Sequence, residues 1–279
     1  MTRSPIIHES GRLLHFGRRP FVAPKMMMRF GDYQKLSFPT APKTFDYWTP
    51  EAEAALRNPY LNTQYGCCVI AWMAHAIAVF MANAGMQPQV FSDAQIVAMY
   101  GAIGGFDPAD PSTDQGCDEN TALDYWLASG FVSPEHKIEG AISVDATNDV
   151  EVAGAAWVLE NLMYGVGLPD HWVSMMSSLK DGDVWDVAGP ANPQNGHCFG
   201  STGRLPNGNY QINSWGFKLQ ITPAANAKYA TPRAGGQLFS VLTKESFNRA
   251  TSRAGNGLDA AAIVADFVGM GGRIGQVGD

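Results

Sequence analysis

The chain has 279 residues, of which 46% are hydrophobic and 16% charged, and its formal net charge is −7. This length and composition predict a globular protein with one sizeable core or two closely packed lobes, which excludes a disordered chain. The longest apolar run, residues 69–82, is shorter than the roughly 20 residues that cross a bilayer, so a membrane-spanning function is excluded.

The first 39 residues form a basic arm. They hold seven Lys or Arg and two acidic residues, while the chain as a whole is acidic. This contrast predicts that the arm lies on the acidic body of the chain or on a protein partner. An anionic partner such as nucleic acid is the weaker alternative, because the arm lacks the interleaved aromatic and basic residues that grip single strands. Residues 1–28 lack a signal-peptide pattern, which predicts a location in the cytoplasm or within a macromolecular assembly.

Cysteines occur at positions 67, 68, 117 and 198. They are too few and too poorly spaced for a disulfide scaffold, and neighbouring cysteines do not easily bond to each other. No CxxC or Cys/His spacing indicates zinc. Reduced thiols are therefore predicted, with no metal and no cofactor.

A central helix is predicted from the run Val69–Phe80, which is apolar on every face and must be buried. Gly66 permits an unusual turn before it, so Cys67 or Cys68 would begin the helix. Unsatisfied N–H groups and the helix dipole stabilise a thiolate at that position. The alternative is that both are ordinary small buried thiols. His75, within the run, is predicted to be a core histidine.

Three further helices and several strands follow. N-capping patterns predict helices over residues 92–101, 118–130 and 148–165. Short runs between Gly, Pro and Asn clusters predict strands at 184–187, 210–213 and 237–242. Helices first and strands later predict an α+β fold of two lobes.

Two loops carry weaker signals. The acidic loop 107–119 lacks the EF-hand spacing of a calcium site, so we interpret it as a solvated cleft rim that favours basic substrates. His171, beside Asp170, is expected to be a loop residue and stays a reserve candidate for catalysis.

The strongest chemical signal lies at Gly196-His197-Cys198 and, sixteen residues after the histidine, at 213–216, which read Asn-Ser-Trp-Gly. His197 can take a proton from a thiol, and Asn213 can hold the imidazole by accepting its other N–H. Trp215 would shield that hydrogen bond from water. The alternative is a surface histidine and an ordinary Asn-Ser turn.

Taken together, these motifs resemble those of papain-like cysteine peptidases. Residues 213–216 match the family's Asn-Ser-Trp-Gly motif, Gly196-His197 matches its histidine, and the interval is the family's. Weaker resemblances occur at 41–48, 115–119, 162–168 and 235–239. The resemblance implies a two-lobed fold over 40–248, with a mainly helical lobe (roughly 40–140) on the central helix and a β-barrel-like lobe (141–248). It leaves 1–39 as a basic arm or short pro-segment and 249–279 as a Gly/Ala-rich tail.

The resemblance also implies the roles of particular residues. Cys68 would be the nucleophile of a triad with His197 and Asn213, and it would attack a peptide carbonyl to form a thioester that water hydrolyses. The oxyanion amide falls on Asn62, with Gln64 as the competing donor. The remaining positions are assigned to the cleft (Gly116, Asp118, Gly196) and to support of the histidine (Trp215).

Three departures from the family pattern affect this interpretation. Val69 replaces the usual tryptophan after the nucleophile, and an alignment on Trp72 instead would place Ala71 at the nucleophile and predict an inactive protein. We prefer the alignment on Gly66, because it keeps a thiol at the helix start. The oxyanion position holds Asn rather than Gln. The family's disulfide partner for Cys117 falls on Tyr65, so that bridge is expected to be absent.

The turn at Asn207-Gly208 sets a geometric condition. A tight two-residue turn would place Asn213 opposite Thr202. The triad therefore requires a wider loop or a bulge near Gly200 or Gly203. If the two side chains lie on opposite faces of the sheet, the catalytic interpretation fails.

Two functions remain in view. The first is a cysteine endopeptidase or amidase acting on a peptide or protein substrate. The second is a papain-like fold that serves as a binding or structural subunit of a larger assembly. Residues 1–39 would be a short autoinhibitory plug in the first case, and deleting them should raise activity.

Overall fold

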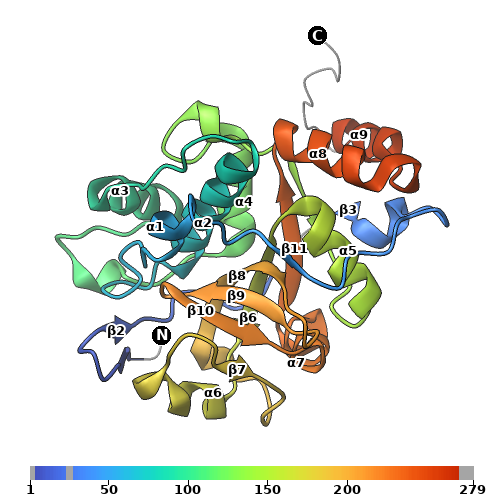
Figure 1. Ribbon diagram of the computed structural model, residues 1–279. Helices are drawn as coiled ribbons and strands as arrows, with labels where there is room; N and C mark the ends of the chain where they lie inside the picture. Colours follow the sequence, from blue (N-terminus) through green and yellow to red (C-terminus); the bar gives the residue numbers. More distant parts are fainter. Residues whose placement is uncertain (1–3, 23–27, 270–279) are drawn as a thin grey trace.

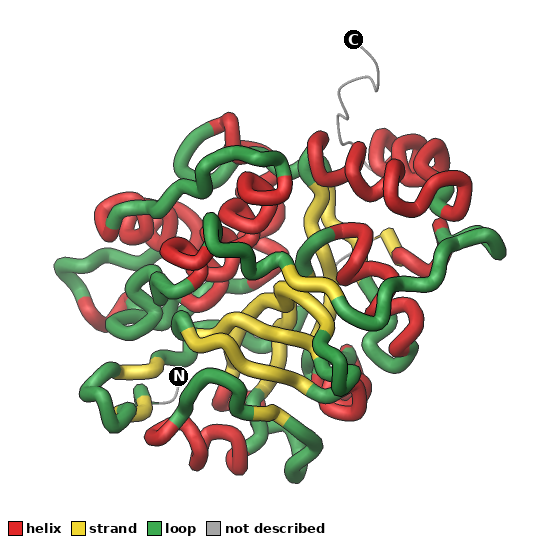
Figure 2. The backbone as a smooth tube through the Cα atoms, viewed as in Figure 1, coloured by secondary structure: helices red, strands yellow, loops and turns green. Residues whose placement is uncertain are grey.

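The computed structural model describes residues 4–22 and 28–269, and they form an α+β fold (Figure 1). The helices of residues 53–129 gather on one side of a large mixed sheet, and the later helices lie around its other sides (Figure 2). The helices are α1 (Glu53–Leu56), α2 (Cys68–Asn83), α3 (Asp93–Gly104), α4 (Glu119–Ser129), α5 (Asp149–Leu159), α6 (Asp170–Met175), α7 (Pro223–Tyr229), α8 (Lys244–Ala254) and α9 (Ala260–Gly269). The strands are β1 (Ile6–Ile7), β2 (Leu13–Leu14), β3 (Met28–Arg29), β4 (Phe45–Asp46), β5 (Gly140–Ser143), β6 (Leu162–Gly167), β7 (Val184–Trp185), β8 (Gly196–Arg204), β9 (Tyr210–Ser214), β10 (Phe217–Ile221) and β11 (Gln237–Leu242).

Helix α2 is the central buried helix that the apolar run predicts. Every residue from Cys68 to Phe80 is buried, and Cys67 occupies the N-cap position. Strand β8 lies so close to it that a Cβ on Gly200 would sit 2.8 Å from the Trp72 ring. Within the described residues, no helix combines the length and hydrophobicity needed to cross a bilayer.

Local capping signals predict the helix starts well and the helix ends less well. The Ser92 capping box is present at α3, and Asp118 and Asn148 cap α4 and α5. Helix α5, however, ends at Leu159 rather than near 165. Glu160 turns into the left-handed region (φ 69°), and the buried residues that follow pair as β6 between β8 and β11.

The sheet is mixed and runs in the order β3-β5-β11-β6-β8-β9-β10-β7, with β4 on the side of β8. Among the described residues its terminal strands β3 and β7, each two residues long, do not pair with each other. The strand-rich lobe is therefore an open sheet, and the barrel implied by the resemblance does not close. One core lies within this lobe around α5, and a second surrounds α2.

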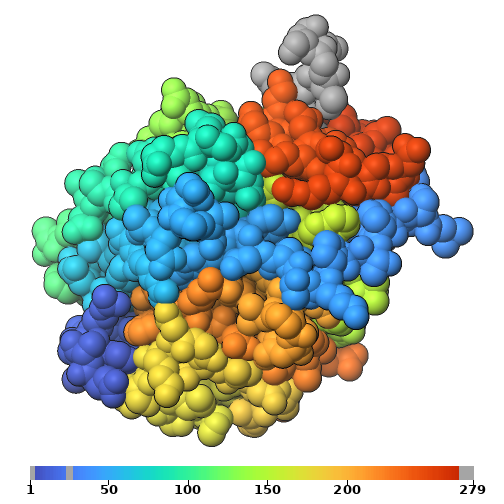
Figure 3. All heavy atoms as spheres, in the orientation of Figure 1, coloured from blue at the N-terminus to red at the C-terminus, as the bar shows by residue number. Residues whose placement is uncertain are grey.

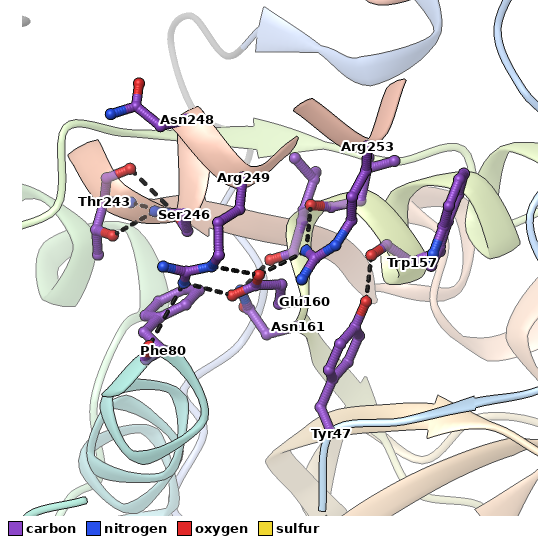
Figure 4. A network of polar contacts seen from close by, with 12 residues as sticks. Tyr47, Phe80, Trp157, Glu160, Asn161, Thr243, Ser246, Asn248, Arg249 and Arg253 are labelled. Atoms are coloured by element: carbon purple, nitrogen blue, oxygen red, sulfur yellow. Dashed lines mark hydrogen bonds and ion pairs between the residues drawn. The ribbon is translucent and has the colours of Figure 1, made fainter. Parts of the chain in front are cut away.

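The C-terminal helices pack on the body. Ile263 and Phe267 of α9 are buried, so the predicted tail contains a helix that packs on the body through these two side chains, while 270–279 lie outside the described residues. Arg249 and Arg253 of α8 both bind the fully buried Glu160 carboxylate at the end of α5, at 2.7 and 2.5 Å (Figure 4). Arg249 also donates to the Phe80 carbonyl of α2.

Candidate active site

Residues 15–19, which we call the strap, lie across the junction of the two lobes. Arg18 pairs in parallel with Cys117, just before α4: the Cys117 N–H donates to the Gly17 carbonyl (2.8 Å), and the Arg19 N–H donates to the Cys117 carbonyl (2.9 Å). On the other side, the Arg18 N–H donates to the carbonyl of Gly196 in β8 (3.1 Å). In the space-filling view the first described residues, dark blue, pack against the body (Figure 3).

The strap meets the walls of the cleft backbone against backbone. A Cβ on Gly17 would lie 1.6 Å from the Gly66 carbonyl oxygen. A Cβ on Gly116 would lie 2.1 Å from the Gly17 oxygen, and one on Gly196 would lie 2.2 Å from the Arg18 oxygen. Side chains at these positions are therefore incompatible with the observed path of the strap.

The start of α2 is held by a polar network from the helical lobe. Asp114 accepts the Gly66 N–H (2.9 Å) and the Tyr100 hydroxyl (2.6 Å). The Tyr100 oxygen in turn accepts the Gly116 N–H (2.8 Å). These bonds fix the turn before the helix, so Cys68 becomes its first residue, as the alignment on Gly66 predicts.

The Cys68 thiol is fully covered. Burial raises its pKa to about 12, and the neighbouring backbone groups of Cys198 and Gly17 only partly offset this. The sulfur therefore lies against the residue that follows His197, and it is protonated at neutral pH. All four cysteines of the chain are buried free thiols, and Cys67 donates to the Tyr60 carbonyl (3.3 Å).

A strap carbonyl occupies the predicted oxyanion position. The Asn62 side-chain amide donates to the carbonyl oxygens of His15 (3.3 Å) and Tyr65 (3.0 Å). The Trp215 indole N–H donates to the same His15 oxygen (3.1 Å). Gln64, the competing donor, is exposed. Of the two candidates, Asn62 is the one whose amide faces the strap.

Strands β8 and β9 contain the bulge that the sequence predicts. Asn213 pairs with Gly200, and the register shifts between Ser201 and Gly203. The connecting loop is wider than a two-residue turn, because the Leu205 N–H bonds to the Asn209 carbonyl. The geometric condition on the loop is therefore met.

His197 and Asn213 lie on opposite faces. Since side chains alternate along a strand, the pairing of Asn213 with Gly200 sets His197, three residues earlier, on the other face. There Nε2 of His197 shares a 2.7 Å hydrogen bond with Oγ of Ser214. The Asn213 amide instead donates to the Leu56 carbonyl of α1 (2.9 Å). The expected His197–Asn213 bond is thus replaced by a His197–Ser214 bond. A register with the bulge after Gly200 places Ser214 on the same face as His197, so it could have indicated this partner.

The imidazole of His197 is buried between two aromatic rings. It stacks on Trp215 at 3.9 Å, and Phe16 of the strap meets it edge-on at 6.4 Å. Burial lowers its pKa to about 3, so the ring is neutral. Nδ1 of His197 and Oδ1 of Asn213 are buried without a partner among the described residues. One ring nitrogen is therefore anchored and the other is available.

Arg18 of the strap forms an ion pair with Glu119, the first residue of α4, which the sequence does not single out. Its Nε lies 2.8 Å from Oε2, and the two side chains are only 3% and 2% exposed. Arg18 also donates to the Gly235 carbonyl (3.0 Å), and Gln237 donates to Glu119. The neighbouring Asp118, which the resemblance assigns to the cleft, accepts the Thr121 N–H as the cap of α4, as the capping pattern predicts.

Comparisons with known proteins agree with this architecture. No protein-family model and no curated protein sequence matches the chain. Among solved structures, xylellain, a cysteine protease from Xylella fastidiosa, superposes with a TM-score of 0.58 over 87% of this chain and 99% of its own, at 12% identity. Digestive procathepsin L 3 from the larval midgut of Tenebrio molitor gives 0.53 over 81% and 73%, also at 12%.

The fold is papain-like. At such low identity the likeness concerns the fold alone, so the roles of individual residues rest on the contacts given above.

The remaining candidates take no part in the contacts of Cys68 and His197 described above. His75 is buried and bonds to the Asn58 carbonyl (2.8 Å), as expected of a core histidine. His171 is exposed. The acidic loop is closed by its own side chains, with Asp110 capping Ser112. Across residues 4–22 and 28–269 no group of three or more His, Cys, Asp or Glu could hold a metal ion.

Proposed function

We propose that the protein is a cysteine peptidase that the strap holds in a closed form. One observation carries this proposal: a single extended segment touches residues that the sequence assigns to the site from separate parts of the chain. The strap contacts Asn62 and Cys68 at the start of α2, Gly116 before α4, and Gly196 and His197 in β8.

The closed form suggests what each group does once the strap leaves. The carbonyl of a substrate peptide would replace that of His15, with the Asn62 amide and the Cys68 N–H as oxyanion donors. Solvent would reach the Cys68 sulfur, and the helix N-terminus would then favour the thiolate. His197, freed from Phe16, would turn Nδ1 toward the sulfur and take its proton.

In this mechanism Ser214 is the positioning residue for the imidazole, in the place of Asn213. The thiolate attacks the carbonyl carbon, and the imidazolium protonates the departing amine as the C–N bond breaks. Water then attacks the thioester, giving up its proton to His197, which returns it to the leaving thiol.

Gly17→Ala tests this proposal because its new methyl group clashes with Gly66 and displaces the strap without deleting it. We expect iodoacetamide at pH 7.5 to label wild-type Cys68 slowly, since roughly one thiol in ten thousand or fewer is ionised at a pKa of about 12. The Gly17→Ala variant should label rapidly at Cys68 and hydrolyse unstructured protein. Adding His197→Ala should abolish both effects. Arg12→Ala, an exposed change in the same arm, serves as the matched control.

Equally slow labelling of all four thiols in Gly17→Ala would contradict the proposal, provided that trypsin then cuts after Arg18 and so reports a displaced strap. That result would favour the second candidate, a papain-like fold used as a binding or structural subunit. The observation in favour of this candidate is the separation of His197 and Asn213 on opposite faces of the sheet.

A further inference from the structure

The Arg18–Glu119 pair lies beside the candidate nucleophile. After burial, the Glu119 carboxylate is among the groups that raise the pKa of Cys68, and Arg18 is among those that lower it. The pair is buried on all sides, as the 3% and 2% exposures show. A cationic side chain of the strap therefore reaches into the protein next to the sulfur.

The body of the protein builds the site that receives Arg18. Glu119 is the first residue of α4, and β6 leaves room for its carboxylate, since a Cβ on Gly165 would lie 2.0 Å from Oε1. Gln237 of β11 donates to Oε2. Oε1 of Glu119 is buried and has no partner among the described residues, so the carboxylate has acceptor capacity that the strap does not use.

Removal of the strap would leave Glu119 in an unfavourable state. A carboxylate that loses its cationic partner while it stays buried is strongly destabilised. A cation that bound in the same place would restore the lost pairing and stabilise the opened protein. Arg18 also shows which cation fits, because its Nε reaches Glu119 while Nη1 reaches the Gly235 carbonyl. A forked guanidinium can make both contacts, whereas an ammonium group is a single point of charge.

We propose that Glu119 is the base of a pocket for a positively charged side chain of the substrate, preferentially arginine, and that Arg18 occupies this pocket in the closed form. This proposal rests on the proposed function, because a peptidase would bind the peptide whose side chain enters the pocket. The binding of a guanidinium group is a separate property and can be measured without catalysis.

The binding test uses agmatine, which carries a guanidinium and an ammonium group at the two ends of a four-carbon chain, and N-butylurea, which has a four-carbon chain and no charge. Millimolar agmatine should raise the melting temperature of Arg18→Ala by several degrees and leave wild type, whose pocket is filled, unchanged. The shift should disappear in Arg18→Ala/Glu119→Gln, and N-butylurea should have no effect on any variant. If Arg18→Ala does not fold, Gly17→Ala takes its place, because there the strap is displaced with Arg18 intact. The proposed pocket would be contradicted if agmatine raised the melting temperature equally in the variants with and without Glu119, or if it did not raise the melting temperature of the opened variant.

The cleavage test uses Gly17→Ala and two peptides that differ only by citrulline in place of arginine. We expect kcat/KM to be at least tenfold higher for the arginine peptide and the preference to vanish in Gly17→Ala/Glu119→Gln. Agmatine binding without hydrolysis of either peptide would keep the pocket and reject the peptidase. Hydrolysis with no preference, together with no agmatine shift, would reject the pocket and keep the peptidase.

Discussion

Two buried histidines make the stability of the fold depend on pH. Burial lowers the pKa of His75 to about 4 and that of His197 to about 3, against about 6.5 in an unfolded chain. Between these values the unfolded chain binds more protons than the folded one. The free energy of unfolding is therefore not reduced by these histidines above about pH 6.5, and it decreases as the pH falls toward 4.

We expect the free energy of unfolding to decrease by up to about 1.4 kcal/mol per pH unit for each of these histidines below about pH 6. Urea denaturation at pH 7.5, 6 and 5 measures this slope. His197→Gln should reduce the slope, while His171→Gln, at an exposed position, should not. Parallel slopes for all three proteins would show that His197 is not buried as described.

At the scale of elements, the approach of β8 to α2 depends on the lack of a side chain at Gly200. Gly200→Ala would place a methyl group 2.8 Å from Trp72, which forces the strand and the helix apart. We expect a loss of about 1 to 3 kcal/mol in urea denaturation. Gly269→Ala makes the same chemical change in open space at the end of α9. A comparable loss of stability in that variant would contradict the claim that the contact with Trp72 causes the loss at Gly200.

The sequence predicts those elements whose signals are local. The start of α2 follows from Gly66 and the apolar run, and the strand at 237–242 has the predicted bounds. The end of α5 could not be predicted, because Glu160 is held by arginines about 90 residues away in sequence. The same distinction applies to the candidate site. Cys68 and His197 can be predicted from sequence motifs, whereas the contact of His197 with Ser214 depends on the position of a bulge.

At the scale of the molecule, Glu160 joins three parts of the chain, since its carboxylate holds α8 against the ends of α5 and α2 (Figure 4). Glu160→Gln removes the charge and leaves two arginines without their partner. We expect a loss of about 3 kcal/mol or more in the free energy of unfolding. Asp181→Asn breaks the exposed ion pair with Arg57 and should lose less than about 1 kcal/mol. Similar losses in the two variants would contradict the assigned role of Glu160.

The path of the strap shows the limit of sequence reasoning at this scale. Charge predicts that the basic arm lies on the acidic body, and the arm does contribute Arg18 to Glu119. Its closest approaches to Gly66, Gly116 and Gly196 involve glycines and main-chain groups, which leave no charge or hydropathy pattern. The register of the strap on the cleft is therefore visible only in three dimensions.

The strap and the cleft that it covers belong to one polypeptide, so closing is a unimolecular event. The fraction of closed molecules is then independent of protein concentration, and dilution does not open them. A tethered segment acts at an effective concentration on the order of millimolar. A competitor in solution has to exceed that local concentration, whereas one cut in the tether releases the strap to diffuse away for good.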